Sequence, residues 1–153
     1  MVAAREKGVD GKVLIGKYYH IIDAKGRVII PAKFRDDLGS SFVVSKGIDS
    51  CLCLYSPDEW QVFESELLSK KGEKARNLQR FLLSDSDECE RDDQGRALIS
   101  KELREAVGLS REVVIIGVSN HAEIWDRVKW DAYRSGPKLT HEELLQAMED
   151  LGM

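Results

Sequence analysis

Two arginines, each placed directly after a tight turn, are the residues of this chain best suited to bind another molecule. Arg27 follows the segment Asp23-Ala-Lys-Gly26, and Arg96 follows Asp92-Asp-Gln-Gly95. Aspartate at the first position and glycine at the fourth are typical of a type I turn that closes into a glycine bulge. A nearby aspartate orients the guanidinium, whose donor fork matches O6 and N7 of guanine in the major groove. The pattern indicates a nucleic-acid contact.

The two turns belong to a longer internal repeat. Residues 20–35 align with residues 89–104 at a constant offset, which also matches Arg35 with Arg104. A repeat of this length predicts a duplicated supersecondary unit. In the nucleic-acid interpretation, Lys25, Lys33 and Arg35 face phosphates, which position a protein without reading sequence. In the second copy the further candidates are Lys101 and Arg104, of which only Arg104 matches a candidate of the first copy. The residues alone leave open a second interpretation, in which the duplication is purely structural.

Each repeat predicts the same series of elements. Strands are expected at 18–22, 28–30, 42–45 and 51–55, and again at 86–91, 97–99, 113–116 and 122–125. The second hairpin of each repeat is expected to turn at Gly47 and Gly117. Helices are expected to begin at Pro31, Ser56, Ser100 and Asp126, and the shorter two to end at Gly39 and Gly108. Matched aromatics in the closing helices, Trp60 with Trp130 and Phe63 with Tyr133, predict core packing.

Five segments follow from this pattern. They are a polar N-terminal extension (1–13), the first repeat (14–68), a connecting helical segment interrupted near Gly72 (69–85), the second repeat (86–136) and a C-terminal helical tail (137–153). In the connecting segment one helix face is apolar, at Leu78, Phe81 and Leu82. The tail opens with a capping box at Thr140 and carries an apolar stripe of Leu144, Leu145, Met148 and Leu151. This stripe packs either on its own domain or on a neighbouring subunit.

Composition limits the class of protein. The 153 residues are 42% hydrophobic and 33% charged with both signs mixed, as in a globular protein with one domain or two small ones. No apolar run approaches the roughly 18 residues of a membrane helix, and no signal peptide is recognisable. We predict a reduced, cytoplasmic protein. The net charge of −4 argues against nucleic acid, but basic residues gather at 17–35 and 70–80, and acidic ones at 84–93 and from Thr140 onward.

Catalytic and metal sites are not expected. The chain has no glycine loop of the P-loop or dinucleotide type, and its three histidines are far apart in sequence. Cys51-x-Cys53 has the wrong spacing for a zinc knuckle and lacks a second cysteine pair, and residues two apart share one face of a strand. We predict that these cysteines pack, and that the protein is no enzyme and has no metal, no cofactor and no small-molecule substrate.

Several motifs together resemble one known family. They are Gly16-Lys-Tyr-Tyr-His20, Asp23-Ala-Lys-Gly-Arg27 with Ile30-Pro-Ala-Lys-Phe-Arg35, Gly47-Ile-Asp-Ser-Cys-Leu-Cys-Leu-Tyr55, Gln79-Arg-Phe-Leu-Leu-Ser84 and Asp92-Asp-Gln-Gly-Arg96. From about Leu14 to Tyr133 the chain resembles MraZ, a family of bacterial regulators related to AbrB-type transition-state proteins. The resemblance implies an α+β, β-rich fold: a tandem duplicated swapped-hairpin, AbrB-like double-split β-barrel with short helices.

The resemblance also implies a function. Family members form homo-oligomeric rings, bind short direct repeats in double-stranded promoter DNA, and repress the division and cell-wall gene cluster that includes their own gene. The DNA-contacting turns carry over to Asp23 and Arg27 and to Asp92 and Arg96. The expected location is the cytoplasm, in association with the nucleoid. The alternative is an oligomeric protein-interaction module, favoured by the acidic pI of about 5.5, or an antitoxin-like protein of the same fold.

Two departures from the family pattern affect the second copy. Ser100 stands where the family commonly has proline, and Asp93 adds a negative charge inside the second turn. Asp93 is also the last residue of the acidic run at 84–93. We therefore expect the Arg27 half to hold DNA more firmly than the Arg96 half.

Overall fold

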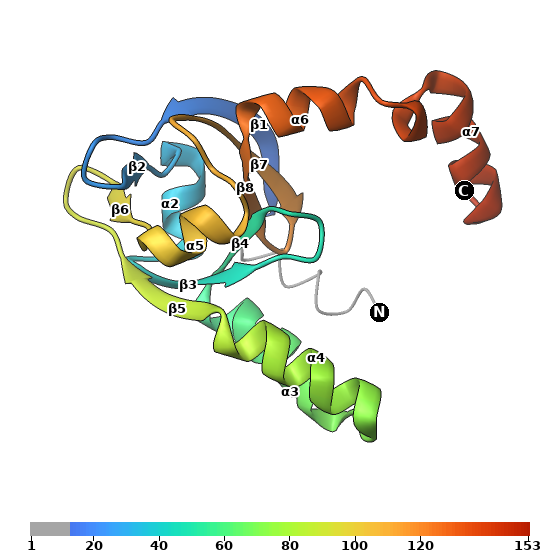
Figure 1. Cartoon of the computed structure of the whole chain (residues 1–153), viewed down its shortest axis with the longest axis horizontal. Coiled ribbons are helices and arrows are strands. Elements are labelled where there is room, and N and C mark those ends of the chain that lie inside the picture. The colour runs from blue at the N-terminus through green and yellow to red at the C-terminus, as the bar shows by residue number, and fades with distance from the viewer. Residues whose placement is uncertain (1–12) are drawn as a thin grey trace.

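The computed structural model describes residues 13–153, so the predicted N-terminal extension lies, except for Val13, outside the described residues. Figure 1 shows a body of antiparallel strands around short helices, with two helical arms. The strands are β1 (Leu14–Ile21), β2 (Arg27–Ile29), β3 (Ser41–Lys46), β4 (Leu52–Tyr55), β5 (Ser86–Glu90), β6 (Arg96–Leu98), β7 (Glu112–Ser119) and β8 (Ala122–Asp126). The helices are α2 (Ala32–Leu38), α3 (Pro57–Ser69), α4 (Glu73–Ser84), α5 (Lys101–Ala106), α6 (Arg127–Arg134), the 3₁₀ helix η2 (Pro137–Leu139) and α7 (His141–Asp150).

The strands form two sheets, which confirms the α+β class. The larger sheet has the order β1-β7-β8-β4-β3-β5, and β2 pairs with β6 in a separate two-stranded ribbon. Every pairing is antiparallel. Among the described strands the larger sheet does not close into a barrel, because β1 and β5 each pair on one side only. The strands therefore form an open six-stranded sheet and a separate two-stranded ribbon.

The two repeats exchange strands. The first strand of each repeat pairs with the third strand of the other, β1 with β7 and β5 with β3. Repeat-equivalent residues meet directly at Val28 and Ala97 in the ribbon, and at Cys53 and Glu123 between β4 and β8. A pseudo-two-fold axis therefore passes between the two members of each pair. The predicted hairpins across the two Asp-x-x-Gly-Arg turns are wrong in this respect, because the return strands β2 and β6 pair mainly with each other.

The sequence predicts a turn at Gly117, but this glycine lies inside β7. It pairs with Gly16 of β1, and a Cβ at Gly117 would lie only 2.5 Å from the backbone nitrogen of Ile15. The glycine is required because two backbones approach closely there. The actual turn follows at Ser119, which has a φ of 68°, and the carbonyl of His121 accepts the N–H of Val118.

The predicted helix starts are confirmed by side-chain caps. The oxygens of Ser56, Ser100, Asp126 and Thr140 accept the backbone N–H three residues later, at 3.1–3.3 Å. Pro31 differs by one position, since it precedes α2 as its N-cap residue. The predicted interruption at Gly72 separates α3 from α4, where the glycine has a φ of 100°. Local sequence therefore determines where these helices begin and end.

Two apolar clusters hold the body together. The larger one lies between the six-stranded sheet, the ribbon and helices α2 and α5, and it contains Phe34, Leu103, Val28 and Ala97. The smaller one lies on the other face of β4 and β8, under α3 and α6, and contains Tyr55, Trp125 and Trp130. Trp60 and Phe63 pack against this smaller cluster, and Tyr133 stacks on Trp125 at 5.0 Å. The predicted core packing is confirmed for Trp130, whereas Trp60 and Phe63 are partly buried and Tyr133 is 44% exposed.

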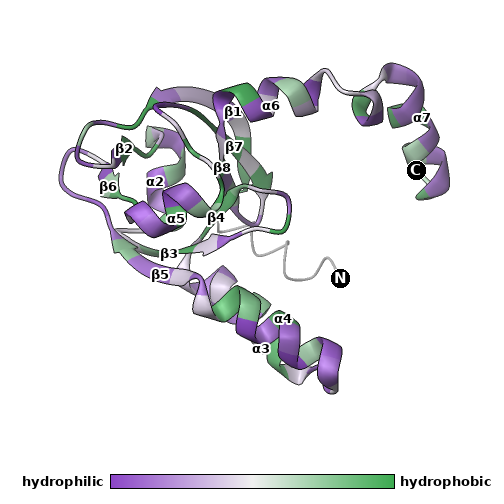
Figure 2. Cartoon of the chain, in the orientation of Figure 1, coloured by the Kyte–Doolittle hydropathy of each residue, from purple (hydrophilic) through white to green (hydrophobic). Residues whose placement is uncertain are grey.

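Two helical arms extend from the body, the pair α3–α4 and the chain of α6, η2 and α7 (Figure 1). The apolar stripe of α7 is exposed: Leu144, Leu145 and Met148 are about half exposed, and Leu151 is 75% exposed. Figure 2 shows α7 as a mixture of hydrophobic and hydrophilic segments. The alternative in which the stripe packs on its own domain is therefore wrong. No helix in the described part of the chain has both the length and the apolar character needed to cross a membrane.

Candidate nucleic-acid interface

Asp23 organises the first turn with three hydrogen bonds. Its Oδ1 accepts the backbone N–H groups of Lys25 and Arg27, each at 2.9 Å, and its Oδ2 accepts Nε of Arg27 at 2.7 Å. Gly26 has the positive φ, 89°, that the predicted bulge requires. The backbone N–H of Arg27, and after it the guanidinium, lower the pKa of Asp23. The ion pair is therefore intact at neutral pH and is lost only as the pH falls through this lowered pKa.

The second turn reproduces the first. Oδ1 of Asp92 accepts the N–H groups of Gln94 and Arg96 at 3.0 and 2.8 Å, and Oδ2 accepts Nε of Arg96 at 2.8 Å. Gly95 has a φ of 83°, and the pKa of Asp92 is lowered first of all by the Arg96 backbone N–H. In both turns the aspartate engages Nε, so its bond to the guanidinium does not use the Nη donors. The predicted orientation of each arginine by its aspartate is confirmed.

The ribbon places both arginines on one face. Arg27 lies opposite Leu98, and Arg96 lies opposite Ile29. Cross-strand partners in an antiparallel pair share a face, so these four side chains form one outer surface, which we call the ribbon face. Each arginine side chain is about one-third exposed, whereas Val28 and Ala97 on the opposite face are buried in the larger core. The core thereby holds the ribbon with its arginines outward.

Ile29 and Leu98 are ribbon-face residues that the sequence analysis missed. They are 42% and 60% exposed, next to the two arginines. The available signal was the alternation in Arg-Val-Ile and Arg-Ala-Leu, where a buried middle residue turns the outer two to the same side. Apolar side chains in a major-groove reader contact the methyl group of thymine. The ribbon face thus combines guanidinium donors with apolar contacts.

The side chains of Arg35 and Arg104 pack against the two turns. Nε of Arg35 donates to the carbonyl of Ile30 at 2.8 Å, and Nε of Arg104 donates to that of Ile99 at 3.0 Å. Each guanidinium covers the turn glycine of the other repeat: a Cβ on Gly95 would lie 2.2 Å from Cζ of Arg35, and one on Gly26 would lie 2.9 Å from Nη2 of Arg104. The predicted phosphate contacts of these two arginines stay a prediction, but their geometry already assigns them a supporting contact.

The three candidate lysines are exposed. Lys25 is in the first turn, Lys33 is on α2, and Lys101 is on α5. Lys101 makes only a 3.9 Å contact with Glu105 in which both side chains are largely exposed, a pairing worth little in water. Asp93 is exposed in the second turn. The two copies therefore share their turn geometry and differ in the charge around it.

The contact between Arg35 and Gly95 predicts a specific coupling. Gly95→Ala should destabilise the fold, because alanine is strained at a positive φ and its Cβ displaces the Arg35 guanidinium. In a double-mutant cycle measured by urea unfolding, adding Arg35→Ala should relieve part of this cost, with a coupling of about 0.5–3 kcal/mol. Gly26→Ala combined with Arg35→Ala is the matched control, since Gly26 faces Arg104, and should be additive within about 0.5 kcal/mol. Additivity in both cycles would refute an energetic coupling between Arg35 and Gly95.

Comparison with known proteins agrees with this geometry. A family model described as "MraZ protein, putative antitoxin-like" matches twice, at residues 13–81 and 82–148. A protein of Alkaliphilus oremlandii (strain OhILAs) is 46% identical over 143 residues, and one of Thermoanaerobacter sp. (strain X514) is 46% identical over 145 residues. Each alignment covers 92% of this chain and the whole of the relative. Both relatives are named "Transcriptional regulator MraZ", the name of a regulator and not of an enzyme. This chain, with its two matched repeats, belongs to the MraZ family.

Proposed function

We propose that this protein is a cytoplasmic, nucleoid-associated transcriptional regulator that binds double-stranded promoter DNA sequence-specifically through the ribbon face. The observation that carries the proposal is the placement of Arg27 and Arg96 on one exposed surface, each oriented by its own aspartate. A two-stranded ribbon fits the major groove, and a positioned guanidinium pairs bidentately with guanine. Exposed Lys25, Lys33 and Lys101 would contact the flanking phosphates.

Affinity in this proposal comes from several subunits. One ribbon face reaches only a few base pairs, so useful binding requires a homo-oligomer that engages closely spaced direct repeats together. The exposed stripe of α7 supports self-association, because its four apolar side chains are half-exposed or more on an arm that extends from the body. We infer a ring that represses the division and cell-wall gene cluster, including its own gene. The name of the relatives, "Transcriptional regulator MraZ", supports the role of a regulator.

The direct test is a titration of the full chain with the DNA upstream of its own gene. The comparison is the same DNA with its direct repeats scrambled, each measured at several salt concentrations. We expect preferential binding to the native repeats, with log K falling as salt rises because phosphate contacts release counterions. No measurable binding at low salt would favour the alternative, an oligomeric protein-interaction or antitoxin-like module.

Lys33→Ala separates phosphate contact from base readout. We expect it to weaken binding about equally on native and scrambled DNA, and to reduce the slope of log K against log salt by about 1. Lys74→Ala is the matched control, because Lys74 is an exposed lysine on α4, on the arm away from the ribbon. An unchanged slope for Lys33→Ala, or the same change for Lys74→Ala, would remove Lys33 from the DNA interface.

A further inference from the structure

Two thiols, an imidazole and a carboxylate lie together on the face of the sheet away from the larger core. The Sγ atoms of Cys51 and Cys53 and a carboxylate oxygen of Glu123 are all within 4.8 Å of one another. Nε2 of His121 lies 3.0 Å from Oε2 of Glu123. Cys51 and Cys53 are buried, and the side chains of His121 and Glu123 are only 15% and 19% exposed. The four side chains form a compact group that the DNA-binding proposal does not use.

The strand exchange between repeats assembles this group. Cys51 and Cys53 are two residues apart on the strand segment around β4 and point to one side, while the alternating Leu52 and Leu54 enter the larger core. His121 and Glu123 have the same spacing at the start of β8, and Glu123 pairs directly with Cys53. The cysteine pair alone has the wrong spacing for a zinc knuckle, but the second pair of ligands comes from the other repeat.

We propose that Cys51, Cys53, His121 and Glu123 bind a transition-metal ion, and that zinc is the metal that fits them best. Two thiolates, one imidazole and one carboxylate are the donor types that zinc takes in four-coordinate sites. Zinc bond lengths of about 2.0–2.1 Å to nitrogen and oxygen give a tetrahedral edge of about 3.3 Å between such ligands. The 3.0 Å separation of the His121 nitrogen and the Glu123 oxygen is close to this edge.

Neighbouring side chains already orient the two ligands from the second repeat. Oδ1 of Asn120 lies 2.7 Å from Nδ1 of His121, which directs the opposite ring nitrogen, Nε2, toward the cluster. Nε1 of Trp125 donates to Oε1 of Glu123 at 2.9 Å and leaves Oε2 facing His121. Partners of this kind set the tautomer and the direction of metal ligands in established sites. The outer contacts of a metal centre are thus present in the fold.

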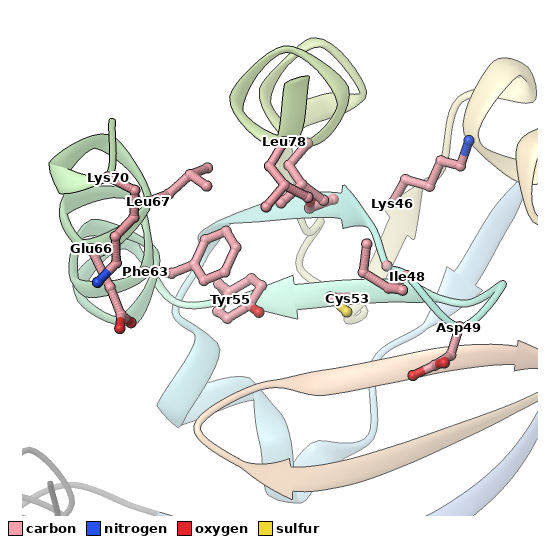
Figure 3. Close-up of a pocket in the computed structure, with 13 residues that line it drawn as sticks. Lys46, Ile48, Asp49, Cys53, Tyr55, Phe63, Glu66, Leu67, Lys70 and Leu78 are labelled. Carbon is pink, nitrogen blue, oxygen red and sulfur yellow. The ribbon is translucent and has the colours of Figure 1, made fainter. Parts of the chain in front are cut away.

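Gly47 flanks both cysteines, and Cys53 also lines a cavity. A Cβ at Gly47 would lie 3.1 Å from the Sγ atoms of both cysteines, so any larger residue would crowd the sulfurs. Cys53 lines a cavity of about 460 Å³ under α3 and α4, together with Tyr55, Phe63 and Leu78. Figure 3 shows the Cys53 sulfur on β4 between Tyr55 and Ile48. The metal would link β4 of the first repeat to β8 of the second and stabilise their exchange by mass action.

The test uses the full-length chain, purified without an affinity tag that binds metal and kept reduced with a non-thiol reductant. Cobalt(II) chloride is the spectroscopic probe. We expect saturation at one cobalt per chain, with sulfur-to-cobalt charge-transfer absorption and the visible bands of tetrahedral cobalt, and loss of both on addition of zinc chloride. Zinc should also raise the thermal midpoint of the wild-type chain. Absence of these bands in the folded wild-type chain would overturn the proposal.

Variants assign the ligands. The double variant Cys51→Ser/Cys53→Ser should abolish the charge-transfer bands, and His121→Gln and Glu123→Gln should lower cobalt affinity at least tenfold while the chain stays folded by circular dichroism. The matched control is Cys89→Ser, because Cys89 is the remaining cysteine and lies in the larger core, where its thiol contacts the Leu98 carbonyl. Cys89→Ser should keep the bands and the zinc-dependent stabilisation. Bands that survive Cys51→Ser/Cys53→Ser, or that disappear in Cys89→Ser, would refute this site.

Discussion

Replacing Arg27 with alanine should weaken binding to the native promoter repeats by about 1–3 kcal/mol for each engaged site, or about 5- to 150-fold. The loss follows from the geometry of the turn, because Asp23 holds Nε and does not use the Nη donors of the guanidinium, which could then contact a base. It should be larger on native than on scrambled DNA, since a base contact and not a phosphate contact is removed. A mobility-shift titration on both sequences measures the two losses.

The second repeat provides an internal comparison for this result. Arg96→Ala removes an arginine with the same ion pair, but from a turn that also carries the exposed Asp93. We expect a smaller loss than for Arg27→Ala, because the extra negative charge weakens phosphate contact there. Arg134→Ala, an exposed arginine on α6, should have no effect. Wild-type affinity and base preference in Arg27→Ala would remove the ribbon face from the DNA-binding surface.

Phe34→Ala should lower the free energy of unfolding by about 3–5 kcal/mol, the range measured for large aromatic-to-alanine changes in protein cores. Phe34 is fully buried on α2 and meets the ring of Tyr18 edge to face at 5.4 Å. Its removal leaves a cavity in the larger core, which also contains the inner ribbon residues Val28 and Ala97. Equilibrium urea unfolding at a fixed protein concentration measures the loss.

The control for Phe34 lies on the same helix. Lys33→Ala changes an exposed neighbour and should stay within about 0.5 kcal/mol of the wild type. Leu103, the repeat equivalent of Phe34, is also buried, and Leu103→Ala should cost about 2–5 kcal/mol. A loss below about 1 kcal/mol for Phe34→Ala would show that the larger core does not depend on this ring.

Features set by neighbouring residues could be predicted from the sequence. The turn at Asp23–Gly26, the caps at Ser56 and Thr140 and the break at Gly72 each depend on hydrogen bonds or backbone angles within a few residues. The same local signals repeat in the second half, so the duplication and its two oriented arginines were predictable as well. Strand ends and the position of Pro31 shifted by one or a few residues, since helix and strand ends depend on the chain that packs beside them.

Pairings between distant segments could not be predicted in this way. A strand pattern shows which residues face inward, but does not identify the partner strand, so the sequence predicted hairpins where β2 pairs with β6. The same limit explains Gly117, whose role depends on the approach of β1 about one hundred residues earlier in the chain.

The sequence by itself determined the chemistry that this protein can offer: two turns that each orient an arginine, capped helices, and an apolar stripe on the last helix. Only the tertiary structure decided which of these groups act together. It placed Arg27 and Arg96 on one face with Ile29 and Leu98, laid Arg35 over Gly95, and brought Cys53 opposite Glu123. The physical reason is that turns and caps are closed by bonds a few residues apart. The ribbon face and the thiol cluster depend on strand exchange across the pseudo-two-fold axis, which burial of the whole core stabilises.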